Sequence, residues 1–357
     1  MRQLRPIPDP LLQQARLQYG LITDQQCSDA GVSRSRIRTL IQRGCWSRVA
    51  CHVIDTDQTP LPQHHPDARR LRAVILGLLS YGPNAIAVGA SALALHGIAG
   101  VPLGLAPQIT HPNASHHRAR DLIDARMFDD GMDVVVIDGW RCASVPWALA
   151  QSVPELSRVV AVSCLDSALN KHLLTPDELD AAHWHARGRR GVAKTHSWWQ
   201  EADGRSESPL ETAARLECKD FGIPPDELQL EQVDANGIRR RLDLAWRLPN
   251  GLVLAAEIDG REYHSGLEPA YADRARQNAL IVGGSLAVLR FTARDLQQRG
   301  LIARTVTEAL RSTNTSLPHR TGRQASAEPA DLVANSPVEN QISRFDGSSG
   351  PDWPVRR

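Results

Sequence analysis

The spacing of apolar residues divides the chain into stretches of different kinds, beginning with a helical stretch at the N-terminus. Apolar positions recur at helical intervals between turn residues, which predicts helices over Pro10–Gln18, Asp24–Ala30 and Arg34–Arg43. Thr23 and Ser33 are placed to cap the second and third helices. The segment Cys45–Ile54 then fits a β-wing, so the pattern predicts a winged helix-turn-helix.

The third predicted helix has two faces of opposite character. Ile37, Leu40 and Ile41 form an apolar face, while the polar face carries Arg34, Arg38 and Gln42 at intervals of four. Arg and Gln side chains suit both phosphate and base-edge contacts, and Arg48 in the wing would lie near a DNA backbone. A small helical module used for packing or protein contact is the structural alternative.

The stretch from Pro66 to about Gly204 has enough apolar residues for a core but no recognisable chemistry. Helices are predicted over Ala68–Leu79, Ala90–His96, Ser144–Ser152, Leu156–Asn170 and Thr175–Ala186, and strands over Gln108–His111 and Val134–Asp138. We therefore expect a middle domain that is mainly helical, with some α+β character from these strands. His183 and His185 alternate with Trp184 on one helix, so they should face different ways and make a poor metal pair.

From Ser208 onward the pattern becomes one of helix and strands. A helix that starts at Ser208-Pro209 and ends before Gly222 leads into strands over Leu228–Val233, Arg241–Arg247 and Leu252–Ile258. A helix over about Glu268 to Ile281, a strand over Leu286–Phe291 and a last helix capped by Thr292 follow. The predicted core is an α+β unit of order αβββαβ, closed by a final helix.

Acidic residues occupy unusual places on this framework. Glu211 lies in the first turn of the helix, Asp243 and Glu257 interrupt apolar strands, and Asp259 follows the second of these strands. A carboxylate in an apolar strand is costly to bury unless it is paired or ligated. Acids at strand ends are also common as surface caps or salt-bridge partners, which is the structural alternative.

The chemistry that this arrangement suggests is hydrolysis of a phosphodiester. Asp243 and Glu257, at the ends of neighbouring strands, could converge on Mg²⁺ (or Mn²⁺), which takes oxygen ligands and keeps several waters. Such an ion activates water and neutralises charge on phosphoryl oxygens. Glu211 could orient that water, and His264 could move a proton or contact the phosphate.

These residues resemble the PD-(D/E)XK nuclease superfamily, within it the branch similar to very-short-patch-repair endonucleases. The matching words are Ser208-Pro209-Leu210-Glu211, Arg241-Leu242-Asp243-Leu244, Glu257-Ile258-Asp259-Gly260 with His264, Asp273-Arg274, and Val288-Leu289-Arg290-Phe291-Thr292. The resemblance implies a restriction-endonuclease-like fold, with a central mixed sheet between helices. It also implies a Mg²⁺ site at Asp243, Glu257 and the carbonyl of Ile258, with Glu211 and His264 as helpers.

One position departs from the superfamily pattern. A lysine is expected two residues after the second acid, where this chain has Asp259. The positive charge would then come from His264, Arg261 or Arg274, or the metal would act without it. The same departure leaves open an inactive nuclease fold that only binds nucleic acid, with Arg274 as a contact in either case.

The N-terminal stretch resembles the winged helix of AbiEi-type antitoxins. The matching words are Gly20-Leu21-Ile22-Thr23, Gly31-Val32-Ser33, Leu40-Ile41-Gln42-Arg43-Gly44 and Trp46-Ser47-Arg48-Val49. That family consists of transcriptional autorepressors of toxin–antitoxin systems, so the resemblance implies DNA binding and, as a partner, a toxin or other defence protein. Residues 1–50 hold eight Arg and three Asp, which makes this region basic in a chain whose net charge is +1.

Composition and sequence patterns also bear on the expected location of the protein in the cell. No run approaches the length of a membrane span, the N-terminus lacks a signal-peptide core, and the six cysteines show no CxxC pairs. We therefore expect a cytoplasmic protein without disulfides or zinc ribbons. The expected domains are residues 1–58, 66–204 and 205–312, followed by a disordered tail over 313–357.

Two functions follow from these patterns. The first is a metal-dependent DNA endonuclease that a winged helix holds on DNA. The second is an antitoxin-like transcriptional regulator whose nuclease fold binds only nucleic acid or a partner protein.

Overall fold

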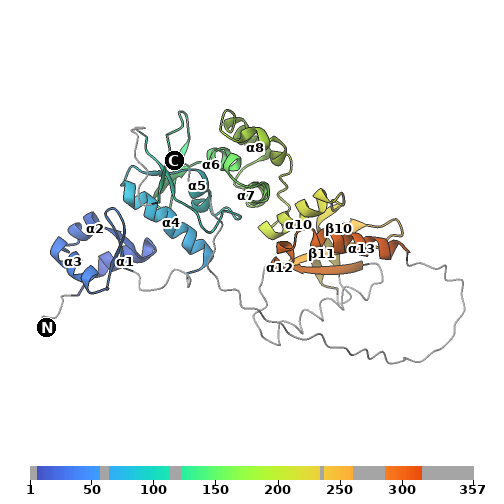
Figure 1. Ribbon diagram of the computed structural model, residues 1–357, viewed down its shortest axis with the longest axis horizontal. Coiled ribbons are helices and arrows are strands. Elements are labelled where there is room, and N and C mark those ends of the chain that lie inside the picture. The colour runs from blue at the N-terminus through green and yellow to red at the C-terminus, as the bar shows by residue number, and fades with distance from the viewer. Residues whose placement is uncertain (1–5, 57–63, 113–121, 234–236, 260–285, 316–357) are drawn as a thin grey trace, which may run out of the picture. The chain divides into compact units, whose positions relative to one another are not determined.

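A computed structural model of the chain describes residues 6–56, 64–112, 122–233, 237–259 and 286–315. These residues combine helices with three separate sheets, so the expectation of a mixed α and β protein is confirmed (Figure 1). No helix within these ranges is both long enough and apolar enough to cross a bilayer.

The N-terminal region contains the three predicted helices and a small sheet. The elements are α1 (Asp9–Leu17), β1 (Leu21–Thr23), α2 (Asp24–Asp29), α3 (Arg34–Gln42), β2 (Ser47–Ala50) and β3 (Val53–Asp55). Thr23 and Gln26 form a reciprocal capping box at the start of α2, and the Ser33 hydroxyl caps α3. The strands form an antiparallel sheet of order β1-β3-β2, in which β2 and β3 are a hairpin at the position where the sequence predicted a wing.

The middle region contains more sheet than we expected. Its helices are α4 (Pro66–Tyr81), α5 (Gly89–Leu95), α6 (Val145–Ser152), η2 (Val153–Glu155), α7 (Arg158–Asn170), α8 (Pro176–His185), η3 (Val192–Lys194) and α9 (His196–Trp199). Its strands are β4 (Ile86–Ala87), β5 (Gln108–Thr110), β6 (Asp124–Ala125), β7 (Val134–Ile137) and β8 (Trp140–Ala143). They form one sheet of order β6-β5-β4-β8-β7, of which the sequence predicted β5 and β7, so helices predominate in this region but a sheet of short strands accompanies them. Strands of two residues are too short to produce a period of their own.

Helix α4 packs on the N-terminal sheet. Leu21 and Val53 from that sheet share a buried core with Val74 of α4. Arg72 of α4 is 7% exposed, forms an ion pair of 2.7 Å with Asp55, and also donates a hydrogen bond to the carbonyl of Tyr19. A buried arginine needs such partners, so this contact fixes α4 against the sheet.

The C-terminal region is a four-stranded mixed sheet with helices packed on one face. Its elements are α10 (Pro209–Asp220), β9 (Glu227–Val233), β10 (Arg239–Arg247), β11 (Val253–Asp259), β12 (Leu286–Thr292), α12 (Ala293–Gln297) and α13 (Leu301–Thr315). The sheet order is β12-β11-β10-β9, with β11 and β12 parallel and the other pairs antiparallel. Residues of α10 and α13, including Ala214 and Ile302, pack with Leu244 and Leu254 of the sheet in one core. The helix predicted over Glu268 to Ile281 lies outside the described residues.

The last predicted helix is two helices. Gly300 has a φ of +77°, a left-handed conformation that separates α12 from α13. The Glu217 carboxylate of α10 accepts hydrogen bonds from the backbone N–H groups of Gly300 and Ala303, each at 3.1 Å, and so caps α13. Because α13 continues to Thr315, it runs past the predicted start of the tail at residue 313.

Helices α7 and α10 are joined by a buried polar network. Asp166 of α7, 1% exposed, accepts hydrogen bonds from the Thr212 hydroxyl, the Arg215 guanidinium and the Asp203 backbone N–H, each at 2.7 Å. Arg215 also donates to the Glu201 carbonyl at 2.9 Å. The network therefore bridges the domain boundary predicted at residues 204 and 205.

Candidate functional site

The two central strands of the C-terminal sheet separate where the predicted acids lie. β10 pairs with β11 only as far as Leu244 opposite Ala256, although β10 stays paired with β9 as far as Arg239. One residue beyond Leu244, the Asp243 carboxylate accepts a hydrogen bond of 2.7 Å from the backbone N–H of Ile258. The Asp243 carboxylate therefore accepts a hydrogen bond from a β11 backbone N–H at the point where the β10–β11 ladder ends. This bond holds Asp243 beside the end of β11.

An irregularity in β9 faces the same point. Leu228 and Leu244 pack in the core under the helices. Leu230 and Leu242, each two residues away on the same strand, would share that face in a regular strand but pack in a small cluster on the other face. The strands therefore change faces at Gln229 and Asp243, which the register between β9 and β10 skips. Gln229 has a φ of +54°, a conformation that costs a non-glycine residue energy and is common at functional sites.

Gln229 is turned toward Glu211. The Glu211 carboxylate is 7% exposed and accepts hydrogen bonds of 2.8 Å from the Gln229 side-chain amide and from the backbone N–H of Glu207. Burial raises the pKa of Glu211, and the negative charge of Asp243 raises it further, against the opposing hydrogen bonds from Glu207 and Ser208. Glu211 and Asp243 are therefore close enough to interact, and Glu211 can hold a proton nearer neutrality than an ordinary glutamate.

Glu257 is buried beside Arg290, a residue of the matching word Val288–Thr292 to which the sequence analysis gave no role. Glu257 is 8% exposed and lies opposite Arg290 in the parallel ladder between β11 and β12. The Glu257 carboxylate forms an ion pair of 3.2 Å with the Arg290 guanidinium, whose side chain is 20% exposed. Asp259 ends β11 and is exposed. The signal for Arg290 was present in the sequence, since it interrupts an apolar strand as Glu257 does.

The donor set determines which metal could bind. Within the ranges that the structure describes, no three His, Cys, Asp or Glu side chains gather closely enough to hold an ion. Mg²⁺ needs fewer protein ligands, since it commonly binds one or two carboxylates and completes its shell with water and phosphate oxygens. Asp243 and Glu257 lie on adjacent strands and provide hard oxygen donors, which are the ligands that such an open site uses. His264 and Arg274 lie outside the described residues.

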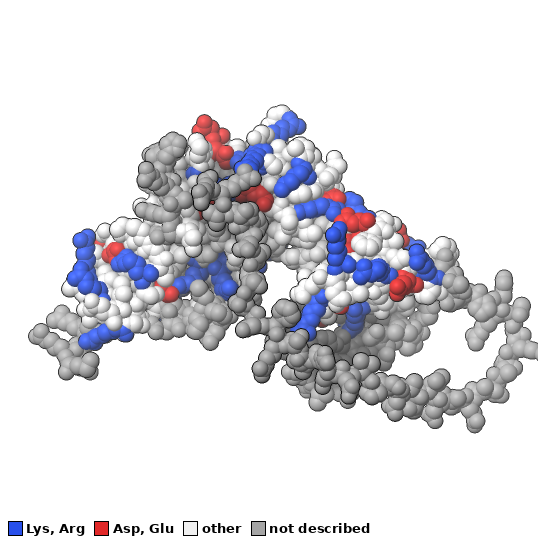
Figure 2. Space-filling model, in the orientation of Figure 1, with Lys and Arg blue, Asp and Glu red and all other residues white. Residues whose placement is uncertain are grey.

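The amphipathic character predicted for α3 is confirmed. Ile37 and Leu40 are buried, whereas Arg34, Arg38 and Gln42 are all exposed. Basic side chains predominate over the part of Figure 2 that corresponds to α1–α3 in Figure 1, while both signs are mixed elsewhere on that face. A long exposed row of donors on a helix is suited to the phosphates and base edges of a DNA groove.

Arg48, which we expected near a DNA backbone, forms an ion pair within the N-terminal region. Its guanidinium donates hydrogen bonds of 2.8 and 3.1 Å to the two carboxylate oxygens of Asp24 at the start of α2. The hydrogen bond from Arg48 lowers the pKa of Asp24, which keeps the pair charged. The prediction missed this partner because it lies 24 residues away in sequence.

Two other predictions concern cysteine and histidine. All six cysteines are described and none is in a disulfide. His183 hydrogen-bonds His196 at 2.8 Å and stacks on Trp199, while His185 stacks on Trp147. The two histidines therefore point to different partners, as their spacing predicted.

The chain is similar to two proteins of Mycobacterium tuberculosis. It is 36% identical over 137 residues to MT2308 of strain CDC 1551 / Oshkosh and to Rv2248 of strain H37Rv, both described as uncharacterized. The aligned segment is 38% of this chain and 49% of each relative, so the chain spans about half the length of the curated relatives it matches. No protein-family model matches the chain.

Proposed function

We propose that the chain is a metal-dependent DNA endonuclease that α3 holds on DNA. The observation that carries the proposal is the meeting of Glu211, Asp243 and the end of β11 where β10 and β11 separate. Two buried or half-buried carboxylates and one backbone segment from three different elements converge there. Strained backbone at Gln229 supports a functional site, because a purely structural sheet has no need of it.

Each residue of the proposed site would have its own role in hydrolysis of the phosphodiester. Asp243, Glu257 and the carbonyl of Ile258 would hold Mg²⁺ or Mn²⁺, which supplies an activated water and neutralises charge on the phosphate. Glu211, kept protonatable by burial and oriented by Gln229, would accept a proton from the attacking water. Arg290 would balance the charge of Glu257 and provide the cation that the absent lysine provides in related nucleases.

DNA binding by α3 would compensate for weak sequence selection at the cleavage site. Arg34 and Arg38 would contact phosphates or guanine edges, and Gln42 would reach a base edge. A second binding module raises the local concentration of DNA at the nuclease without any new contact at the cleavage site.

The proposal is tested by incubating supercoiled, linear, mismatched and single-stranded DNA with the full chain and Mg²⁺ or Mn²⁺. Cleavage should vanish on chelation and fall by about 100-fold or more in Asp243→Asn and in Glu257→Gln. Glu231→Gln is the matched control, since Glu231 lies on β9 of the same sheet and is 69% exposed. Its cleavage rate should match that of the wild type, and DNA affinity should be unchanged in all three variants.

A second function, an antitoxin-like regulator that binds DNA or a toxin without cleaving, is favoured by one observation. The Glu257 carboxylate is ion-paired with the Arg290 guanidinium, which makes this carboxylate less available to a metal ion. No cleavage of any substrate with DNA binding intact would support this function. The regulator should then bind its own promoter equally well with Asp243 and Glu257 substituted.

A further inference from the structure

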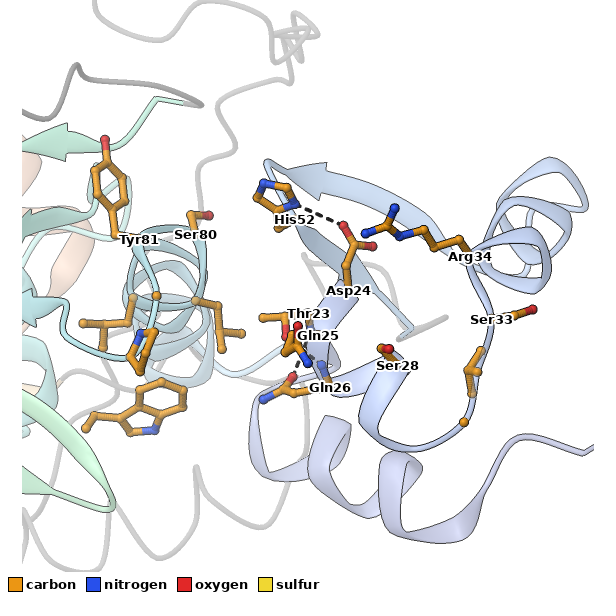
Figure 3. Close-up of a pocket in the computed structure, with 17 residues that line it drawn as sticks. Thr23, Asp24, Gln25, Gln26, Ser28, Ser33, Arg34, His52, Ser80 and Tyr81 are labelled. Carbon is orange, nitrogen blue, oxygen red and sulfur yellow. Dashed lines mark hydrogen bonds and ion pairs between the residues drawn. The ribbon is translucent and has the colours of Figure 1, made fainter.

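A cavity of about 910 Å³ lies beside the helix proposed to contact DNA. One wall is formed by the C-terminal end of α4, the turn after it and β8, and includes Leu78, Leu79, Pro83 and Trp140. The opposite wall is polar and comes from α2, the turn after it and the start of α3, including Gln25, Ser28, Ser33 and Arg34 (Figure 3). The volume falls within the range of known small-molecule sites.

The elements that form the walls are held in place by buried contacts. Val74 and Leu78 of α4 share a core with Leu21 and Val53 of the N-terminal sheet. The buried pair of Arg72 and Asp55 adds a charged contact across the same junction. Because α2 and α3 follow directly from that sheet, the two walls belong to packed elements, and a ligand would meet a largely preformed site.

The charges around the cavity favour one class of ligand. The Asp24 carboxylate is already engaged by Arg48 and by His52, the latter at 3.3 Å. The Arg34 guanidinium, by contrast, makes no hydrogen bond or ion pair with any described residue. A guanidinium without a partner among the described residues suits a single negative charge, whereas a polyphosphate would place further negative charge near Asp24.

We propose that this cavity binds a small aromatic monoanion, such as a two-ring carboxylate. The rings lie against Leu79 and Trp140, and the carboxylate accepts a charge-assisted hydrogen bond from Arg34. Because Arg34 is the first residue of α3, an anion that engages it competes with a DNA phosphate and weakens DNA binding. This effect on DNA rests on the proposed role of α3, whereas ligand binding itself does not.

Calorimetric titration of the full chain with 2-naphthoate tests the site. The neutral isostere 2-naphthamide should bind about tenfold more weakly, because it lacks the charge that Arg34 recognises, and ADP should bind weakly or not at all. Ser28→Trp fills the cavity from an exposed position on α2 and should abolish 2-naphthoate binding. Arg34→Gln should weaken it about tenfold. Arg38→Gln is the matched control, one turn further along α3 and outside the cavity lining, and should bind 2-naphthoate like the wild type.

Fluorescence anisotropy of a labelled duplex then measures the coupling. Saturating 2-naphthoate should weaken DNA binding by the wild type about fivefold or more, and should have no effect on Ser28→Trp, which is expected to bind DNA normally. Binding of 2-naphthoate that survives both Ser28→Trp and Arg34→Gln would overturn the site, as would equal binding of 2-naphthamide. Binding without any change in DNA affinity would overturn the coupling. Should the chain bind no DNA at all, the proposed function of α3 fails, while calorimetry still decides the cavity.

Discussion

The N-terminal and C-terminal regions differ in how far the charged side chains of interest are exposed to solvent. In the N-terminal region the ion pair of Asp24 and Arg48 has side chains that are 30% and 42% exposed, and α3 presents Arg34 and Arg38 to solvent. In the C-terminal region Glu211 and Glu257 are less than a tenth exposed. Exposed charges cost little and are available to a large charged ligand, whereas buried carboxylates need partners that hold them in fixed positions. The charges of the first region are thus accessible to a ligand, whereas the buried acids of the second are held in fixed positions.

The test of this comparison with the largest expected effect on stability concerns the buried network between α7 and α10. Asp166→Ala leaves the Arg215 guanidinium buried without its carboxylate, so we expect the free energy of unfolding to fall by about 3 kcal/mol or more. Urea denaturation of the full chain measures it. The double variant Asp166→Ala/Arg215→Met removes both charges and should regain much of the loss. A loss below about 1 kcal/mol would place this network with exposed pairs and weaken the contrast between the regions.

The same contrast explains what the sequence could and could not predict. The spacing of Ile37, Leu40 and Arg38 predicted both faces of α3, because helix period and exposure are local properties. The strands of the C-terminal sheet were predicted for the same reason. The break between α12 and α13 at Gly300 was not predicted, because the apolar pattern continues across this glycine.

Contacts within the candidate site were less predictable. Gln229 lies 18 residues from Glu211, and Arg290 meets Glu257 only because β12 returns parallel to β11. Such pairs depend on strand register, which no local pattern specifies. The acids were recognisable because each is unusual in its own strand, but the residues that orient them were visible only once the sheet was formed.

A smaller effect should appear in the pH dependence of stability, through Glu211. Burial raises the pKa of Glu211 above its ordinary value of 4.5, so between that value and the raised pKa the folded protein binds more protons than the unfolded chain. Its contribution to stability is therefore fully present below pH 4.5 and is lost as the pH rises through the raised pKa. Glu211→Gln cannot titrate, so the free energy of unfolding of the wild type minus that of the variant should fall with rising pH.

Urea denaturation at a series of pH values from about 4 to about 8 gives this difference. A difference that rises with pH would mean that the hydrogen bonds from Glu207 and Gln229 outweigh burial, and that Glu211 is held ionised. The same series with Glu231→Gln reports the effect of removing a carboxylate from the exposed edge strand, and serves as the reference.

The smallest effect on stability is expected at the exposed pair of Asp24 and Arg48. Arg48→Ala should lower the free energy of unfolding by less than about 1 kcal/mol, and added salt should reduce the loss further. Denaturation at low and high salt measures both. A loss as large as that of Asp166→Ala would show that the N-terminal region also depends on fixed charge pairs.

The pair should matter more for DNA than for folding. Asp24→Asn removes a negative charge and loosens its hold on Arg48, so this variant should bind DNA more tightly than the wild type, while Arg48→Ala should bind more weakly. Anisotropy titrations across salt concentrations separate these effects, because loss of one phosphate contact lowers the salt slope by about one. If both variants bind DNA like the wild type, Arg48 serves only to brace the wing against α2, and α3 alone faces the DNA.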